Sequence, residues 1–472
     1  MSTFPSRPRH SKLPVVVLLV VIVIAAVAGG GYYLWPRIES ERPQIVITPS
    51  IDTMGLAPLE IQVTDKGTGL KSVTATLSQS GTDHNLASEQ FARPVTERKI
   101  AVALTKVPGL KDGPAVIRVT ARDAALWSGN ESVLEKNLMI DTTPPTLELI
   151  ADDRYVNFGG VGAIVYKASS DTATSGIKVG DHFFPGFAGQ VKGHPDYFLA
   201  LFAHPYDVAP ETKATLVATD NAGNTREMRL AYELKNVKYR KSTLSVSENF
   251  LQNKVAPLLT ESAARQAPPK DVFVAVNKQL RQENDKRIAD VTRKTTPALL
   301  WKGAFSQLSN SKVEANFADQ RTYVYNGEAI DTAYHLGYDL SVTKNYPVEA
   351  ANGGTVVFAG DLGIYGNTVI LDHGLGLFTL YGHLSSIDVK AGDSVTRRQV
   401  LGKTGETGLA AGDHLHFGVY LDGVAVLPVE WWDQKWIDDN ITPKLEGRTG
   451  LEIAEAQKPV KGTRKVGGKR RP

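Results

Sequence analysis

Five of the ten histidines of this 472-residue chain fall between residues 335 and 416. In this stretch His335 is followed four residues later by Asp339, and His414 is followed two residues later by His416. Imidazole and carboxylate groups are the usual protein ligands of catalytic zinc, which takes three of them and keeps a position for water. The pattern therefore predicts a zinc site, with further histidines beside it that can move protons.

Short β-type segments separated by glycines must position these side chains. They cover residues 356–359, 368–371, 377–381 and 417–420. Residues two apart on a strand point to the same face, so His414 and His416 can face one groove. His335 and Asp339 can likewise share one side of an extended segment. No intervening segment is long enough for a crossover helix, so we expect a mainly antiparallel sheet.

Three motifs in this stretch resemble those of the LytM/lysostaphin-type zinc metallopeptidases. The motifs are His-x-Gly-x-Asp (335–339), Tyr-Gly-His-Leu-Ser (381–385) and His-Leu-His-Phe (414–417). The likeness covers about residues 316–432. The family cleaves peptide bonds in bacterial peptidoglycan, so the resemblance implies peptidoglycan as the substrate and one Zn²⁺ in the catalytic domain.

The resemblance also implies a role for each matched position. The metal ligands would be His335, Asp339 and His416. The catalytic pair that activates water and stabilises the oxyanion would be His383 and His414. One departure is Asp413, where the family usually has proline. Its negative charge can raise the pKa of His414.

Other polar residues near the motifs receive weaker expectations. His373 follows a strand and is expected to be structural. Arg321 is a candidate for binding a substrate carboxylate, with a surface role as the alternative. The candidates for hydrogen-bonding an oxyanion are Tyr323, Tyr325 and Tyr334.

Composition excludes several classes of protein. The chain has no cysteine, so a disulfide framework, a thiol nucleophile and a thiolate metal site are excluded. Its net charge of +3 is nearly balanced, so we expect no nucleic-acid partner. A chain of 472 residues is too long for one core, so we expect two to four domains.

An uncharged apolar run at residues 13–35 follows a basic segment, residues 1–12. A helix of about 20 residues crosses the roughly 30 Å hydrocarbon core of a bilayer. Basic residues before it predict a cytoplasmic N-terminus. We therefore expect a single-pass anchor in the cell (inner) membrane, with the catalytic domain periplasmic or otherwise extracytoplasmic. A cleaved signal peptide is the alternative, because Ala26-Val27-Ala28 resembles a cleavage site.

Two β-sandwich modules are predicted at residues 38–142 and 146–240. Polar and apolar residues alternate in segments such as 44–48, and turn residues separate the segments. A weak repeat relates the turn from Asp123 to Asn130 to the turn from Asp220 to Asn224. The modules resemble bacterial immunoglobulin-like domains, and a spacer or pairing role is expected for them.

A helical connector is predicted at residues 241–305. Residues 247–259 and 271–291 are rich in helix formers, and Pro268-Pro269 separates them. Two interpretations remain open. The connector is a packed linker, or it lies beside the catalytic groove and restricts access to it.

Residues 441–472 are predicted to form a basic disordered tail. Lysine and arginine crowd the last 15 residues, with no acid among them. The tail is either a solvated segment or a contact for anionic wall polymer or lipid headgroups.

The predicted fold class is multidomain and mainly β. It combines one N-terminal transmembrane helix, two sandwiches, a helical connector and a C-terminal antiparallel β metallopeptidase domain at residues 306–440. The predicted function is that of a zinc-dependent endopeptidase hydrolysing peptide cross-links or stem peptides of peptidoglycan in cell-wall remodelling. The alternative is a non-catalytic wall-binding regulator that recruits or activates other hydrolases.

Overall fold

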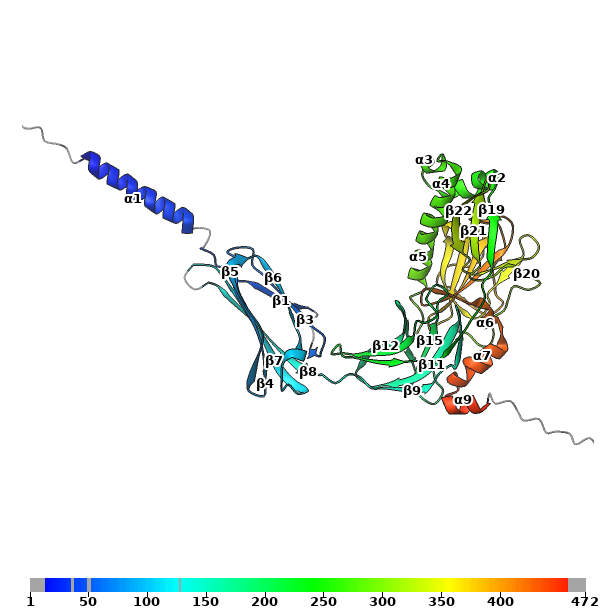
Figure 1. The fold of residues 1–472 in the computed structure, drawn as a ribbon, viewed down its shortest axis with the longest axis horizontal. Helices are drawn as coiled ribbons and strands as arrows, with labels where there is room; N and C mark the ends of the chain where they lie inside the picture. The colour runs from blue at the N-terminus through cyan, green and yellow to red at the C-terminus, as the bar shows by residue number, and fades with distance from the viewer. Residues whose placement is uncertain (1–12, 35–37, 49–51, 127–128, 457–472) are drawn as a thin grey trace, which may run out of the picture. The chain divides into compact units, whose positions relative to one another are not determined.

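A computed structural model of the chain describes residues 13–34, 38–48, 52–126 and 129–456 (Figure 1). The described chain is multidomain and mainly β, with one apolar helix near the N-terminus, as predicted. It divides into two compact units. The first comprises residues 1–144 and 219–225, and the second comprises residues 145–218 and 226–472.

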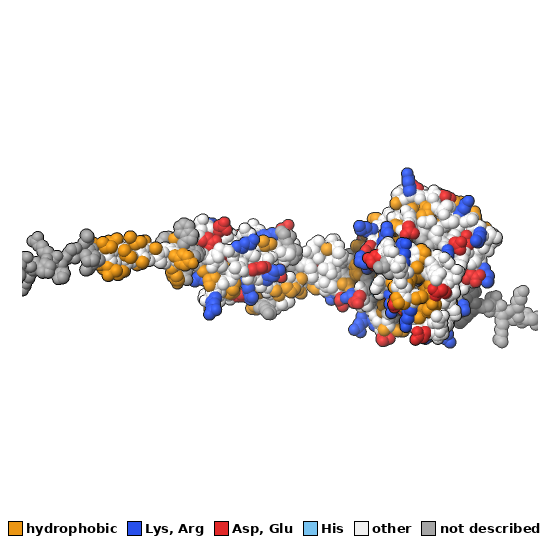
Figure 2. Space-filling view, turned by 90° about the horizontal axis from the view of Figure 1, so that it is seen from above, with side chains coloured by type: hydrophobic (Ala, Val, Ile, Leu, Met, Phe, Trp, Pro, Cys, Tyr) orange, Lys and Arg blue, Asp and Glu red, His pale blue; other side chains and the backbone are white. Residues whose placement is uncertain are grey.

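The N-terminal helix α1 (Leu13–Leu34) has 22 residues and is about 33 Å long at about 1.5 Å per residue. Its surface in Figure 2 is uniformly hydrophobic, and none of the side chains from Val16 to Tyr33 is buried. Such a helix can be a membrane span or a signal sequence. The predicted basic segment 1–12 and Trp35 lie outside the described residues.

The first unit contains two sheets around one apolar core. One sheet has the antiparallel order β1 (Gln44–Thr48), β3 (Leu59–Thr64), β6 (Glu97–Val102). The other has the order β2 (Thr53–Met54), β8 (Glu131–Ile140), β7 (Gly113–Asp123), β4 (Leu70–Gln79), β5 (Thr82–Val95). Apolar residues such as Ile61, Val73 and Val119 are fully buried between the sheets. Alternation with period two thus predicted these strands correctly.

The predicted repeat turn is built twice from the same hydrogen bonds. The Asp123 Oδ1 atom accepts from the backbone N–H groups of Ala125 and Asn130, at 3.0 and 2.6 Å. The Asp220 Oδ1 atom accepts in the same way from Ala222 and Asn224, at 2.9 and 2.8 Å. In both turns the asparagine side chain also donates to Oδ2 of the aspartate. Each aspartate therefore holds its own loop closed.

The second unit begins with two four-stranded sheets. They have the orders β14 (Phe187–Ala188), β15 (Phe198–Ala203), β11 (Val161–Ala168), β9 (Leu147–Ala151), and β13 (His182–Pro185), β12 (Thr172–Val179), β16 (Ala214–Asp220), β17 (Thr225–Arg229). Their buried residues, such as Phe202, join one apolar core with residues of the C-terminal domain such as Trp431. The buried Glu430 carboxyl accepts hydrogen bonds from Asn157 Nδ2 and the Val161 N–H. These contacts hold both parts in one unit.

The connector is helical, as predicted. Its elements are α2 (Glu248–Phe250), η3 (Leu251–Val255), η4 (Ala256–Leu258), α3 (Ser262–Arg265), α4 (Pro269–Val274), η5 (Ala275–Leu280) and α5 (Arg281–Val291). Pro269 stands in the first turn of α4, where its missing N–H is not needed. The buried face, including Phe273 and Ile288, packs against residues of the C-terminal domain such as Phe378. The strand before it, β19 (Lys241–Ser245), pairs in parallel with β21 (Gln320–Tyr325).

The C-terminal domain is built on an antiparallel sheet. Its order is β20 (Lys312–Ala315), β23 (Tyr338–Ser341), β31 (Leu415–Leu421), β27 (Leu377–Leu384), β26 (Asn367–Asp372), β25 (Gly354–Asp361), β29 (Ser394–Val395), and β32 (Val424–Val426) pairs with β31. A smaller sheet has the order β24 (Pro347–Glu349), β30 (Val400–Lys403), β28 (Ser386–Ile387). Every residue of β27 and β31 is buried, so these central strands are fixed firmly in the core.

The predicted disordered tail is wrong for residues 441–456. These residues form helices α8 (Thr442–Leu445) and α9 (Gly450–Ala456), which follow α6 (Pro428–Trp432) and α7 (Gln434–Asn440). Ile441 and Ile453 are buried, and the fully buried Lys444 ammonium forms an ion pair with Asp153. Apolar burial and this ion pair order the segment despite its polar composition. The basic residues after 456 lie outside the described residues.

Candidate metal centre and its cavity

The predicted metal ligands come from three neighbouring segments of the C-terminal domain. Asp339 on β23 lies directly opposite His416 on β31 in the antiparallel ladder. His335 lies in the short link between β22 (Glu328–Tyr334) and β23. On its other side His416 pairs with Gly382 of β27, the residue before His383. The central strand β31 therefore places His416 between Asp339 and the motif at residues 381–385.

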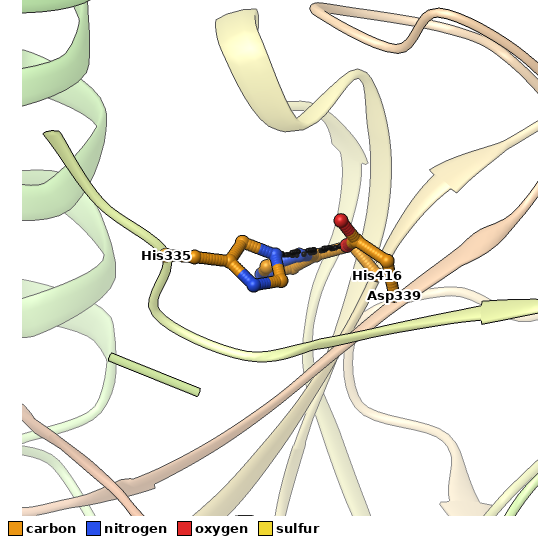
Figure 3. Close-up of side chains that lie close together, drawn as sticks. All are labelled: His335, Asp339 and His416. Atoms are coloured by element: carbon orange, nitrogen blue, oxygen red, sulfur yellow. Dashed lines mark hydrogen bonds and ion pairs between the residues drawn. The ribbon is translucent and has the colours of Figure 1, made fainter. Parts of the chain in front are cut away.

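Three ligand atoms converge at this point, as Figure 3 shows. The His335 Nε2 atom lies 2.9 Å from Asp339 Oδ1 and 3.1 Å from His416 Nδ1. The His416 Nδ1 atom lies 3.0 Å from the same carboxylate oxygen. All three side chains are buried or nearly so, at 6%, 15% and 4% exposure for His335, Asp339 and His416.

This donor set fits a zinc ion. The His335 Nδ1 atom lies 2.9 Å from the Asn316 carbonyl and donates to it, so Nε2 keeps its lone pair. Ligand atoms at about 2.0–2.1 Å from tetrahedral zinc are about 3.3 Å from one another, close to the separations observed here. Two imidazole nitrogens and one carboxylate oxygen, with no thiolate, match the ligand set of a catalytic rather than a structural site.

The glycine of the first motif makes room for His416. A Cβ atom at Gly337 would lie 2.8 Å from His416 Nε2 and 2.6 Å from the Phe417 carbonyl oxygen. Both distances are shorter than real Cβ contacts, so no larger residue fits without moving the imidazole. The motif thus needs glycine for close packing against a ligand.

Arg321 holds the second oxygen of the aspartate. Its Nη2 atom lies 3.1 Å from Asp339 Oδ2, and its side chain is only 20% exposed. Burial by itself would raise the pKa of Asp339. Charge interaction with His335 and hydrogen bonds from the surrounding histidines outweigh burial and hold that pKa well below its usual range. The carboxylate is therefore ionised and ready to bind a cation.

The two remaining motif histidines lie beside the ligand cluster with fixed ring orientations. Their ring centroids are 4.8 Å apart. The His383 Nδ1 atom donates to the Thr407 carbonyl at 2.8 Å, and the His414 Nδ1 atom donates to the Gly412 carbonyl at 2.8 Å. Each ring therefore keeps its Nε2 atom available for another partner.

The two histidines differ in their acid–base properties. Burial, together with repulsion from His414 and His416, lowers the pKa of His383 to about 3. Burial also opposes the charged form of His414, but the Asp339 carboxylate lies 3.5 Å from its Nε2 atom and raises its pKa overall. The main contributions that raise this pKa come from Asp339 and the Gly412 carbonyl, so Asp413 is not their chief source. His383 is thus neutral, whereas the pKa of His414 is shifted in the opposite direction, towards its charged form.

The backbone of His383 is in the left-handed region, with φ at +63°. Residues other than glycine seldom adopt this conformation, because Cβ crowds the following carbonyl group. The buried strand β27 imposes it and directs the imidazole towards His414 and His416. Such strain typically marks a functional position.

A cavity of about 310 Å³ opens over these residues. The three predicted metal ligands and the predicted catalytic pair, His383 and His414, all line it. Its apolar wall comes partly from connector residues, namely Val246, Phe250 and Phe273. The connector therefore lies beside the cavity, as one interpretation of the sequence expected, and restriction of access by it stays a prediction. Tyr323 lines the cavity as well.

Residues 333–428 match the family described as Peptidase family M23. They form a peptidase M23 domain. Over 95 residues the chain is 39% identical to the DD-carboxypeptidase/endopeptidase Mpg of Neisseria meningitidis, covering 20% of this chain and 22% of that protein. Over 115 residues it is 34% identical to the peptidoglycan DD-endopeptidase ShyA of Vibrio cholerae, covering 24% of this chain and 26% of that protein.

A third relative is named as a sporulation protein and not as a peptidase. Over 102 residues the chain is 38% identical to stage II sporulation protein Q of Bacillus subtilis, covering 21% of this chain and 36% of that protein. The chain thus spans between about a fifth and about a third of the length of these curated relatives.

Three residues singled out by the sequence lie away from the ligand cluster of the M23 domain. Tyr325 donates its hydroxyl hydrogen to Glu248 at 2.5 Å. Tyr334 is 44% exposed and packs against Tyr206. The imidazole of His373 is fully buried, where it hydrogen-bonds the Gly353 carbonyl and the Thr379 hydroxyl group. His373 is thus structural, as expected, and neither tyrosine is placed to contact the cluster.

Sequence reasoning did not identify Tyr365, whose ring packs against the proposed ligand His416 in the M23 domain. Its ring centroid lies 5.4 Å from that of His416, and its hydroxyl group donates to Asp285 on α5 at 2.8 Å. The two residues are 80 positions apart in the chain. A tyrosine between Gly363 and Gly366 was the available signal, but no local pattern indicates a partner so distant in the chain.

Proposed function

We propose that the chain is a zinc-dependent endopeptidase that hydrolyses peptide cross-links or stem peptides of bacterial peptidoglycan in cell-wall remodelling. The observation that carries this proposal is the convergence of His335, Asp339 and His416 in a cavity that also holds His383 and His414. The M23 domain and relatives named as endopeptidases support the reaction and the substrate class.

The ligands of the proposed metal are His335 Nε2, Asp339 Oδ1 and His416 Nδ1. When bound, zinc supplies a Lewis acid that lowers the pKa of a bound water and polarises the scissile carbonyl. Arg321 keeps the Asp339 carboxylate oriented, and the Asn316 carbonyl fixes the tautomer of His335.

The other two histidines divide the proton transfers between them. Neutral His383 donates through Nδ1 to a backbone carbonyl, so its Nε2 lone pair can accept a proton from the attacking water. Asp339 raises the pKa of His414, and in its charged form this imidazole carries an Nε2–H that can donate to the oxyanion of the tetrahedral intermediate. The proton that His383 took from the water can then pass to the leaving amine as the peptide C–N bond breaks, which completes hydrolysis.

The other parts of the chain would hold the M23 domain close to peptidoglycan. The apolar helix α1 would anchor the chain in the cytoplasmic membrane, with the N-terminus inside and the M23 domain outside. The β modules would act as spacers between membrane and wall, and the basic segment after residue 456 would contact anionic polymer or lipid. Purified membranes that retain the full-length chain after a carbonate wash would support the anchor over a cleaved signal peptide.

The test is release of soluble peptides from purified peptidoglycan. Full-length protein in detergent micelles is incubated with zinc and sacculi, and the products are identified by chromatography and mass spectrometry. We expect release by the wild type and loss of release in His416→Ala and His383→Ala. The matched control His84→Ala removes an imidazole from β5 of the first unit, which is not part of the M23 domain, and should keep full activity.

Two outcomes would contradict the proposal. Retained release in both site variants would overturn the mechanism. A zinc-loaded wild type that binds sacculi without cleaving them would instead favour the non-catalytic regulator.

A further inference from the structure

Three carboxylates meet at one end of the first unit, in loops from separate parts of its sequence. Glu39 precedes β1, Asp65 follows β3, and Asp123 ends β7. Each offers an oxygen atom, and these atoms lie within 4.8 Å of one another. We call these three residues the carboxylate triad.

The surrounding loops hold the carboxylate triad in place. The Asp65 Oδ1 atom accepts from the Gly67 N–H at 2.9 Å, and Glu39 Oε2 accepts from the Thr68 N–H at 2.5 Å. A Cβ atom at Gly67 would lie 1.6 Å from Glu39 Oε1, so only glycine lets this side chain approach. The triad is thus a built arrangement rather than a chance meeting of surface acids.

The Asn130 side chain links the segment before β1, which contains Glu39, to Asp123 of the triad. The Asn130 Nδ2 atom donates to Asp123 Oδ2 at 2.9 Å and to the backbone carbonyl of Glu39 at 3.0 Å. These bonds orient both acids, but a neutral amide does not cancel their charge. The three carboxylates therefore still face one another as like charges.

The negative charge of the triad is not balanced by the ion pairs of this unit. Asp123 is fully buried, Asp65 is 5% exposed, and Asp65 Oδ2 has no hydrogen-bond partner among the described residues. Burial raises the pKa of Asp65, and repulsion from Glu39 and Asp123 raises it further. The ion pairs described in this unit involve other acids: Asp52, Glu60, Glu89, Glu131 and Glu135. Buried negative charge with no cationic partner among the described residues is costly, and a bound cation would offset this cost.

We propose that the carboxylate triad binds one calcium ion. Calcium takes six to eight oxygen ligands at about 2.3–2.6 Å, and carboxylate oxygens such as those of the triad are among its usual ligands. The Thr68 hydroxyl oxygen, buried without a hydrogen-bond partner in the described structure, is a candidate further ligand. An all-oxygen set is a poor match for zinc, and magnesium requires a stricter octahedral geometry.

The bound cation has a structural consequence. Glu39 belongs to the segment that enters the first unit before β1, whereas Asp65 and Asp123 follow core strands. A calcium ion joins these three segments and fixes the entering chain to the sheets. This role is independent of the M23 site, which is formed by other residues.

The test is titration of calcium chloride into zinc-loaded full-length protein in detergent micelles, followed by calorimetry. Compared with the wild type, Asp65→Asn is expected to bind one calcium ion fewer per chain. Its amide oxygen can still accept from the Gly67 N–H, so the loop is preserved. Glu39→Gln, outside the sheets, is expected to weaken the same site by at least about tenfold, because ligand charge sets calcium affinity.

Thermal unfolding gives a second readout that a folding defect would not reproduce. In EGTA, Asp65→Asn removes carboxylate repulsion, so its unfolding temperature should equal or exceed that of the wild type. Calcium should raise the unfolding temperature of the wild type and leave the variant unchanged. The matched control Asp52→Asn removes a 96% exposed acid of the same unit and should respond to calcium like the wild type.

Three results would overturn the proposal. They are no calcium binding by the wild type at millimolar concentration, the same number of bound ions in wild type and Asp65→Asn, and an equal stabilisation by magnesium chloride.

Discussion

Asp339 and His416 lie opposite each other on neighbouring strands, and the Oδ1 atom of the first is 3.0 Å from the Nδ1 atom of the second. Two of the three proposed ligands are thus fixed by one rung of a buried antiparallel ladder. The third, His335, comes from the link before β23 and depends on the Asn316 carbonyl for its orientation. The site is therefore preorganised by backbone pairing, and the residues around it tune its affinity.

Arg321 is expected to act through Asp339. Replacing it in Arg321→Gln removes a charged hydrogen bond to Asp339 Oδ2, so zinc affinity should fall by about 10–100-fold. Competition with a chelating dye measures this change. Arg98→Gln, which removes an exposed arginine from the first unit, is the control. Unchanged zinc affinity with a higher KM for peptide would instead assign Arg321 to a substrate carboxylate.

Gly337 is expected to be essential for the position of His416. In Gly337→Ala the added methyl group would clash with the His416 imidazole and the Phe417 carbonyl oxygen. Zinc affinity and peptide release should therefore fall at least about tenfold. Gly412→Ala is the matched control, because a Cβ atom there meets nothing within 4 Å. Equal zinc affinity in Gly337→Ala and the wild type would contradict this explanation of the motif.

At His383 we expect glycine to be more stabilising than alanine, which is the reverse of the usual order of stability in a strand. Both His383→Ala and His383→Gly remove the imidazole, so both should be inactive. Glycine also relieves the left-handed conformation, so His383→Gly should be more stable than His383→Ala by about 1 kcal/mol. Urea unfolding measures the difference. A less stable glycine variant would show that φ at this residue is not strained.

The second unit should lose stability in mild acid because of His373. Burial lowers the pKa of this imidazole to about 4 in the folded chain, against about 6.5 when unfolded. Between these values the unfolded chain binds more protons, so the free energy of unfolding should fall as pH falls from about 6.5 to about 4. His373→Gln should flatten this slope in urea unfolding, although the variant itself is less stable. An unchanged slope would assign the pH dependence to other groups.

The alternation of polar and apolar residues and the spacing of the histidines account for most of the correct predictions. Strand alternation located β1, β3, β25 and β26, because side-chain direction on a strand is a local property. The same rule placed the histidines His414 and His416 on one side of a strand, and the structure brings both near Asp339.

Contacts between distant residues could not be predicted. Arg321 reaches Asp339 only through the pairing of strands, and Asp285 meets Tyr365 across 80 positions of sequence. Lys444 looked like part of a solvated tail because composition does not reveal its partner, Asp153. Each case depends on tertiary packing, which a local pattern does not encode.

The most direct test of the central claim is removal and return of the metal. Peptide release from sacculi is measured for protein treated with EDTA and then supplied with zinc in increasing amounts. The account predicts that release stops on removal and returns fully at about one zinc per chain, but not in His416→Ala. Full peptide release by metal-free protein would contradict it.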